Sequence, residues 1–299
     1  LAPPEARDRW YAYTRMAFNA GVGAGALLAG IVVAGGGTTG YRWIVGLNAL
    51  SFTVAALLLV LIHMRPTARE ATTAVSGSYA IVLRDRPFLG LVGANTILWM
   101  SVVVLEVALP PYVVGAAHAP TWIIGPLYAL NTGMIVFLQV PVSRALASWR
   151  RTRRMAIGGL GYGLSFLLFA ATPLLPGAYL VPYLFACTAL YTLGELCLAP
   201  ASYALAAAIA PAGMQGRYLS IYQLSIAGAA TITPVFAGFV LAANPQGLWL
   251  LLALLMVTAA AAVYMLERWL PASALRAQSA APKMALPRWA TKIVTPRWA

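Results

Sequence analysis

The chain has 299 residues, of which 61% are hydrophobic and only 9% are charged, and its formal net charge at pH 7 is +13. A soluble chain of this length needs far more charged residues to cover its surface, so this composition excludes an ordinary soluble protein. The basic residues lie in short segments between apolar runs, a pattern that orients helices in a membrane. We therefore expect a lipid bilayer as partner and no nucleic acid.

Eight apolar runs follow one another along the chain, separated by charged, glycine-rich or proline-containing segments. They cover approximately residues 12–34, 41–62, 88–114, 121–146, 155–175, 178–208, 217–242 and 247–268. About 20 apolar residues form a helix that crosses the hydrocarbon core of a bilayer, and lipid permits only helices or closed barrels. Because these runs are too long for strands, the predicted fold class is an all-α membrane protein.

The first run carries small residues and, near its start, polar ones. Gly21, Gly25 and Gly30 are expected to let neighbouring helices approach closely in lipid. Arg15 and Asn19 lie one helical turn apart near the predicted cytoplasmic end of this run. They are candidates for an inner gate or for a contact with substrate, and the alternative for Arg15 is a side chain that snorkels to the membrane surface.

The connection after the second run, residues 64–87, is the longest polar segment between runs. This connection, the segments on the same side and both chain ends carry nearly all of the basic residues, whereas the opposite connections carry Arg42 alone. Because Lys and Arg are enriched in cytoplasmic loops, we predict that residues 64–87 and both chain ends are cytoplasmic.

Two of the seven acidic residues, Glu106 and Glu195, fall inside apolar runs. A charged side chain at the centre of a bilayer costs about 2.5–3.5 kcal/mol, so its presence needs an explanation. Burial raises the pKa of a carboxyl group, and such a group can bind and release protons near neutral pH. We predict that both glutamates couple transport to protons. The alternative is a structural, hydrogen-bonded role or, for Glu106, a position near the outer surface.

Polar and aromatic side chains recur at helical spacing in the runs that carry these glutamates and in their neighbours. Residues three, four and seven positions apart lie on one face of a helix, and such faces can line a cavity for an amphipathic ligand. The candidate cavity residues are Asn95, Trp99, Tyr128, Asn131, Thr132, Gln139, Thr188, Tyr191, Tyr222 and Ser225.

The seventh and eighth runs resemble the first two. Residues 217–242, RYLSIYQLSIAGAATITPVFAGFVLA, repeat the character of residues 9–34, RWYAYTRMAFNAGVGAGALLAGIVVA, and Gly238 corresponds to Gly30. If these pairs are equivalent, the chain holds about eight of the twelve helices of a protein built from two parallel six-helix repeats. Residues 1–63 would then be the last two helices of the N-terminal half and residues 88–270 the C-terminal half. Residues 271–299 are predicted to form a disordered basic cytoplasmic tail.

With these motifs the sequence resembles the major facilitator superfamily, in particular its bacterial drug:proton antiporters, over residues 7–270. The segment from Gly21 to Gly30 is similar to the antiporter motif Gly-x-x-x-Gly-Pro-x-x-Gly-Gly of the family's fifth helix, with Ala26 in place of Pro and Ala29 in place of Gly. Residues 143–159, SRALASWRRTRRMAIGG, are similar to the loop motif between helices eight and nine but lack its Gly and Asp. The resemblance implies an incomplete facilitator fold in the cell (plasma) membrane.

Taken together, these features predict a monomeric transporter that exports small amphipathic molecules by alternating access, coupled to protons. The alternatives are a sugar, peptide or metabolite permease of the same fold, and a membrane sensor or assembly protein on that scaffold. No nucleophile with a base and no metal-ligand cluster is apparent in the sequence, so no catalytic, cofactor or metal site is expected. Cys187 and Cys197 lie ten residues apart on one run, too far to form a disulfide.

Overall fold

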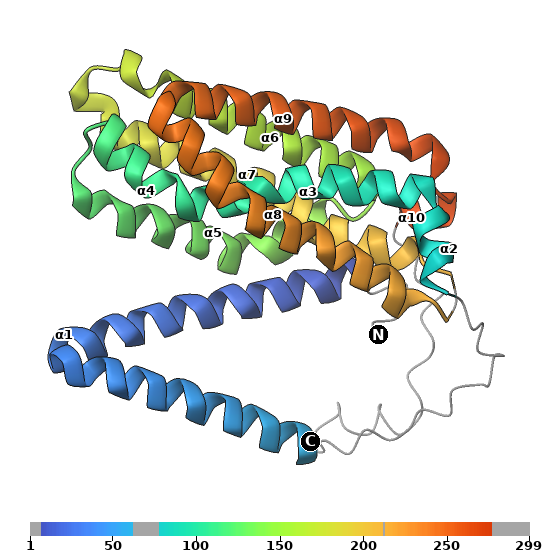
Figure 1. Cartoon of the computed structure of the whole chain (residues 1–299), viewed down its shortest axis with the longest axis horizontal. Coiled ribbons are helices and arrows are strands. Elements are labelled where there is room, and N and C mark those ends of the chain that lie inside the picture. Colours follow the sequence, from blue (N-terminus) through green and yellow to red (C-terminus); the bar gives the residue numbers. More distant parts are fainter. Residues whose placement is uncertain (1–6, 62–77, 212, 277–299) are drawn as a thin grey trace, which may run out of the picture.

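The computed structural model describes residues 7–61, 78–211 and 213–276, and helices are the regular secondary structure throughout these ranges. Six of the helical segments are long and apolar enough to cross a membrane: Arg86–Val107, Thr121–Ala145, Arg151–Leu174, Gly177–Ile209, Gln215–Ala243 and Pro245–Trp269. They match the last six predicted runs, and Figure 1 shows that they form one bundle. The prediction of an all-α membrane protein is confirmed.

Several of these segments are built from more than one helical element. The elements are α3 (Arg86–Val107), α4 (Leu109–Pro111), η2 (Tyr112–Ala116), η3 (Thr121–Ile123), α5 (Ile124–Ala145), α6 (Arg151–Ala171), η4 (Thr172–Leu174), α7 (Gly177–Ile209), α8 (Gln215–Ala243), α9 (Pro245–Leu266) and η5 (Glu267–Trp269). At 33 residues, α7 is longer than the roughly 20 that span a bilayer. It therefore extends beyond the hydrocarbon region or is tilted within it.

The most extensive contacts between helices of the bundle are those of α6 with α7 and with α9. Small residues make this packing close. A Cβ atom added to Gly158 of α6 would lie 2.6 Å from the carbonyl oxygen of Gly194 in α7, so the two backbones touch. At the other end of α6, the indole ring of Trp249 stacks on Phe169 with a centroid separation of 4.9 Å and meets Tyr112 edge-on at 5.0 Å.

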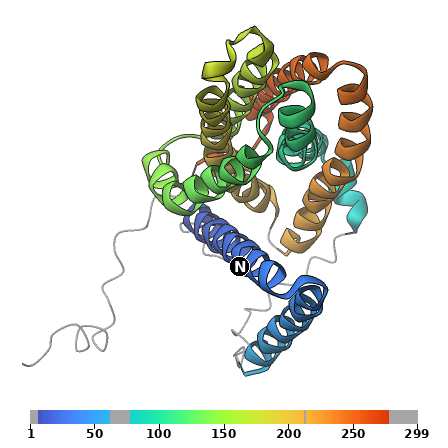
Figure 2. The same ribbon diagram turned by 90° about the vertical axis from the view of Figure 1, so that its left-hand side faces the viewer.

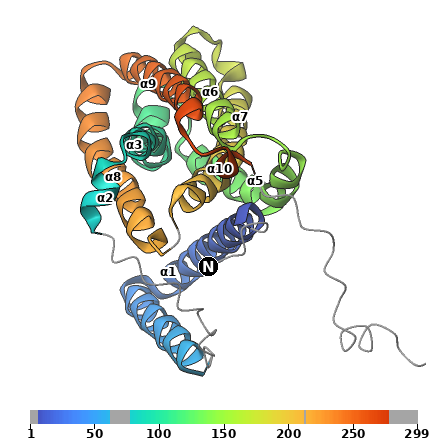
Figure 3. The same cartoon turned by 90° about the vertical axis from the view of Figure 1, so that its right-hand side faces the viewer.

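The N-terminal element α1 (Arg7–Leu61) corrects one detail of the sequence prediction. Two spans joined by a short outer loop were expected, but the helix is continuous over 55 residues. Figure 1 shows that it bends back sharply into two arms, and glycines such as those at 35–37 are a common cause of kinks. Figures 2 and 3 show the N-terminal arm against the bundle and the C-terminal arm standing away from it.

The two polar segments that precede and follow the bundle in the sequence contain short helices. Residues 62–77 lie outside the described residues, but the remainder of the predicted loop 64–87 contains the helix α2 (Tyr79–Arg84). Asp85 then caps α3 by accepting a hydrogen bond from the backbone nitrogen of Phe88 at 3.1 Å. The predicted tail also starts later than Pro271, because α10 (Ala272–Leu275) packs on the bundle and accepts a 2.8 Å hydrogen bond from Arg151 at the carbonyl of Ala274. Residues 277–299 lie outside the described part of the chain.

Candidate transport site

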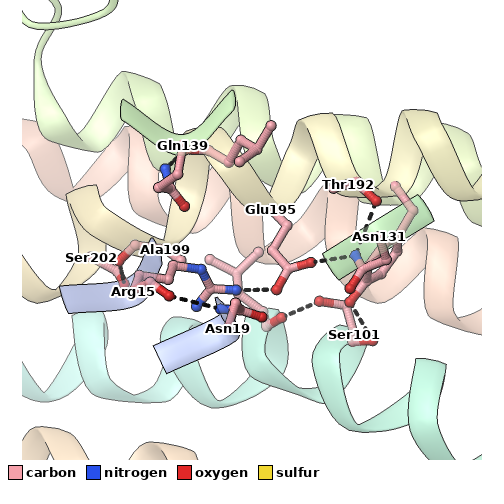
Figure 4. A network of polar contacts seen from close by, with 12 residues as sticks. Arg15, Asn19, Ser101, Asn131, Gln139, Thr192, Glu195, Ala199 and Ser202 are labelled. Atoms are coloured by element: carbon pink, nitrogen blue, oxygen red, sulfur yellow. Dashed lines mark hydrogen bonds and ion pairs between the residues drawn. The ribbon is translucent and has the colours of Figure 1, made fainter. Parts of the chain in front are cut away.

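The centre of the candidate site is an ion pair between Arg15 of α1 and Glu195 of α7 (Figure 4). The side chain of Glu195 is only 5% exposed and that of Arg15 is 15% exposed, so both charges lie largely away from solvent. The second carboxylate oxygen of Glu195 accepts a hydrogen bond from the amide of Asn131 in α5 at 3.0 Å. Three elements therefore meet at one buried carboxylate.

The surroundings of Glu195 keep this carboxylate in place. Asn131 also donates a 3.0 Å hydrogen bond to the hydroxyl of Thr192, which in turn donates to the carbonyl of Thr188 at 2.8 Å. The preceding residue, Gly194, is in backbone contact with α6. A buried charge is tolerated when it is paired and hydrogen-bonded, and Glu195 has both kinds of partner.

The structure decides between the two expectations for Arg15. The side chain does not snorkel to the membrane surface, because its guanidinium group reaches Glu195. Asn19 donates to the backbone carbonyl of Arg15 at 3.0 Å, and its role in a gate stays a prediction. A second polar contact of α1 with the bundle lies nearer the start of α1, where Arg144 of α5 donates a hydrogen bond to the hydroxyl of Tyr13 at 3.2 Å.

An aromatic cluster joins α1 to the same side of the bundle. The ring of Tyr11 in α1 stacks on Tyr203 of α7 at 5.6 Å between centroids. Tyr203 also meets Trp99 of α3 and Tyr222 of α8 edge-on, at 6.2 and 5.3 Å. Trp99 and Tyr222 were predicted as cavity residues, and the sequence analysis did not identify Tyr11 or Tyr203. Tyr11 falls on the polar approach to the first run, where its contact with a residue far along the chain cannot be foreseen.

Six of the predicted cavity residues are buried between the described helices. They are Asn95, Gln139, Thr188, Tyr191, Tyr222 and Ser225. Several of their polar groups bind one another or the backbone: Asn95 donates to Ser225 at 2.7 Å and accepts from Tyr222 at 3.2 Å. Tyr191 donates to the carbonyl of Ser101 at 3.1 Å, and Gln139 to that of Leu196 at 3.1 Å. In this structure these residues form polar contacts between helices, and their role in a substrate cavity stays a prediction.

The remaining predicted cavity residues, Trp99, Tyr128, Asn131 and Thr132, are half-buried. Three of them lie on α5, against which the N-terminal arm of α1 packs. Glu106 is exposed in the last turn of α3, and the hydroxyl of Tyr128 donates to the backbone carbonyl of Leu105 at 2.9 Å. The structure therefore places Glu106 outside the hydrogen-bonded group around Glu195.

The glycines expected to mediate packing are a further correction. A Cβ atom added to Gly21, Gly25 or Gly238 would meet nothing within 4 Å, so these residues do not mediate helix contacts within the described chain. Instead, a Cβ on Gly23 would lie 3.1 Å from the Thr132 side chain of α5. The surroundings of Gly30 lie outside the described residues. The closest packing is at Gly158 and Gly194, and the three glycines at 158, 159 and 161 are the sequence pattern that indicates it.

In the described ranges, no group of three or more His, Cys, Asp or Glu side chains could hold a metal ion. Cys187 is a buried free thiol, and Cys197 is a half-buried one.

Comparisons with known proteins agree with this architecture. The family model described as "Major Facilitator Superfamily" matches residues 1–181. The multidrug resistance protein MdtH of Cronobacter sakazakii is 26% identical over 76% of this chain and 54% of its own length, and that of Aeromonas salmonicida is 27% identical over 75% and 54%. The uncharacterized transporter YdeE of Escherichia coli is 33% identical over 46% of this chain and 33% of its own length.

A solved structure also shares the fold. The crystal structure of a mutant of the peptide transporter POT, in complex with sulfate, has a TM-score of 0.52 and 22% sequence identity, and the match covers 90% of this chain and 55% of that one. The chain thus spans about half the length of the proteins that it matches over most of its own length.

Proposed function

Because the chain belongs to the Major Facilitator Superfamily, and is therefore a multi-pass membrane transporter, we propose that it takes part in proton-coupled export of small amphipathic molecules across the plasma membrane. The single observation that carries this proposal is the buried ion pair between Arg15 of α1 and Glu195 of α7. It rests also on the predicted division of the chain, in which residues 1–63 belong to the N-terminal half and residues 88–270 to the C-terminal half.

On this division, the pair is a charged contact between the two halves of the transporter. Protonation of Glu195 removes the charge that holds Arg15, and an unpaired guanidinium group in a buried position is costly. The contact between α1 and α7 is then weakened, and the two halves can rock relative to each other, which is how transporters with parallel repeats alternate access. One proton thus shifts the balance between two conformations of the protein.

Three points support an amphipathic, positively charged substrate. A cationic ligand can take the place of Arg15 beside the Glu195 carboxylate, so proton and substrate compete for the same group. The half-buried side chain of Trp99 and the cluster around Tyr203 offer aromatic faces to such a ligand. The names of the MdtH relatives, multidrug resistance proteins, also favour drug-like molecules.

Glu106 is proposed as a second protonation site. Its exposed position at the end of α3 lets it exchange protons with water more readily than the buried Glu195. We expect Glu106→Gln to slow export without abolishing it, because Glu195 and its ion pair remain.

Glu195→Gln in the natural full-length protein tests the proposal, because Gln resembles the protonated carboxyl group in size. We expect loss of export driven by a proton gradient in membrane vesicles and weaker binding of a hydrophobic cation such as tetraphenylphosphonium, because the carboxylate that would bind the cation is gone, whereas membrane insertion should be retained. Glu195→Asp, which keeps the charge, is the matched control and should retain part of the transport. Export by Glu195→Gln at the wild-type rate would refute the role of Glu195. Proton release on addition of tetraphenylphosphonium to the wild-type protein distinguishes a coupled transporter from a sensor.

A further inference from the structure

A groove of about 650 Å³ lies on the outside of the bundle where α6 begins and α9 ends. It is remote from the Arg15–Glu195 pair, since none of the residues around that pair lines it. Its walls are apolar and come from two neighbouring helices, with Ile157 and Leu160 on α6 and Val257 and Ala261 on α9. Figure 3 shows these two helices side by side.

The floor of the groove is set by small residues that bring the two helices together. A Cβ atom added to Gly159 of α6 would lie 3.1 Å from the Cβ of Ala260 in α9. Ala156 and Ala260, both nearly fully buried, form the base of the groove. The larger side chains on either side project past this base and leave a channel between them.

The open end of the groove is basic. Arg150, Arg153 and Arg276 line it. The one carboxylate beside them, Glu267, is paired with Arg150 and lies 3.7 Å from the Nε atom of Arg153. Among the described residues, the rim thus carries three guanidinium groups against the one carboxylate of Glu267, which contacts two of them, and it keeps an excess of positive charge.

Aromatic residues show where this rim lies relative to the membrane. Trp149, Tyr264 and Trp269 are all exposed close to it, and Trp and Tyr are enriched at membrane–water interfaces. From the rim, exposed apolar side chains continue along both helices, with Leu164 on α6 and Leu254 on α9. A basic rim at the interface therefore leads into an apolar channel that runs into the hydrocarbon region.

We propose that this groove binds a phospholipid with an anionic headgroup. The phosphate binds the guanidinium groups of Arg150, Arg153 and Arg276, which match phosphate in geometry and charge, and an anionic headgroup brings no cation of its own to be repelled by them. One acyl chain lies between Ile157 and Leu160 on one side and Val257 and Ala261 on the other. A free phosphate ion would use the rim alone and leave the apolar channel without a role.

The experiment compares lipids on the purified full chain by native mass spectrometry in detergent. Phosphatidylglycerol should bind more tightly than phosphatidylcholine of the same acyl chains. The double variant Arg153→Gln/Arg276→Gln should weaken phosphatidylglycerol binding about thirtyfold, the factor that two arginines near an anionic lipid correspond to. The control Arg84→Gln/Arg86→Gln removes the same charge from two exposed arginines, one at the end of α2 and one at the start of α3, and should leave binding unchanged.

A second variant tests the acyl-chain half of the site. Ala261→Trp fills the channel at an exposed position and should also weaken phosphatidylglycerol binding, although the charge of the rim is unchanged. The proposal is overturned if the groove and control variants bind phosphatidylglycerol equally, or if both lipids bind with equal affinity. It is also overturned if inorganic phosphate at the same concentration displaces the lipid, because the site would then bind any phosphate. None of these outcomes bears on proton coupling at Glu195.

Discussion

Glu195 and Arg15 lie 180 residues apart in the chain, and their pairing joins two elements that have few other charged contacts with each other among the described residues. An ion pair in such a buried position is not itself a large source of stability, because both charges must be removed from water. The loss of one partner is more serious, since the other charge is then left buried and unpaired. The pair is thus better suited to a conformational switch than to holding the protein together.

A double-mutant cycle measures this coupling. Arg15→Met and Glu195→Gln each leave one member of the pair without its partner, so each is expected to lower the free energy of unfolding by about 3 kcal/mol. The double variant should lose clearly less than the sum, because it leaves no buried charge uncompensated. Unfolding curves in one detergent, at one lipid content, provide the four values. Strictly additive losses would show that the two side chains do not interact.

Part of this site was predictable from single residues. The cost of an intramembrane carboxylate indicated that Glu195 has a special role and needs a partner. The identity of the partner could not be predicted, because it depends on the angle at which α1 crosses α7 and not on any spacing within one helix. For the same reason, the spacing of Asn95, Tyr222 and Ser225 identified polar helix faces but not whether each face meets a ligand or another helix.

Among the helices, the contact between α6 and α7 leaves the least space. A Cβ atom added to Gly194 would lie 2.7 Å from the carbonyl oxygen of Gly158 and 3.1 Å from the backbone nitrogen of Tyr162. These neighbours are backbone atoms, which cannot turn aside as a flexible side chain can. Because Glu195 follows Gly194 directly, the position of the carboxylate depends on this contact.

Gly194→Ala should therefore separate α6 from α7 and lower both the melting temperature and proton-driven transport. We expect a destabilisation of about 1–3 kcal/mol, typical of overpacking in a tight core. Gly93→Ala in α3 is the matched control, because a Cβ at that position meets nothing within 4 Å and Ala favours the helix over Gly. Its melting temperature should be unchanged or slightly raised. Equal melting temperatures for the two variants would contradict the assigned role of the glycine contact.

The lengths and positions of the six helices of the bundle followed from hydropathy, because a run of apolar residues in lipid has few alternatives to a helix. The elements that hydropathy missed depend on local contacts. The helix α10 forms where Ala274 and Leu275 are buried against the bundle, and α2 starts at Ser78, whose hydroxyl accepts from the backbone nitrogen of Ala80 at 3.2 Å. Neither contact is visible as a periodic pattern.

For the molecule as a whole, arginines at the ends of the bundle helices gather at one end of the bundle, whereas Arg42 lies in α1. Arg84 and Arg144 lie in the last turns of α2 and α5, whereas Arg151 and Arg217 lie in the first turns of α6 and α8. These turns meet at the end of the bundle that α2 and α10 mark in Figure 1. The distribution predicts that this end faces the cytoplasm.

Labelling of single cysteines in intact cells tests this orientation. Cys187 is buried and Cys197 is half-buried, so the background reaction with a membrane-impermeant maleimide should be low. Thr121→Cys, at the exposed start of η3, should react from outside the cell, whereas Ala147→Cys, in the exposed connection between α5 and α6, should react only after the cells are opened. The reverse pattern would place the basic end outside.

The contact between Gly158 and Gly194 has a mechanical consequence. Two helices whose backbones touch cannot slide or rotate independently of each other. On the proposed mechanism, a change in the tilt of α7 on protonation of Glu195 therefore moves α6 as well. The N-terminal end of α6 carries Arg150 and Arg153, which line the proposed phospholipid site. If Glu195 is the protonation site that we propose, binding of a proton there also moves the end of α6 at the membrane surface, and a phospholipid bound to that end changes the free-energy difference between the two conformations.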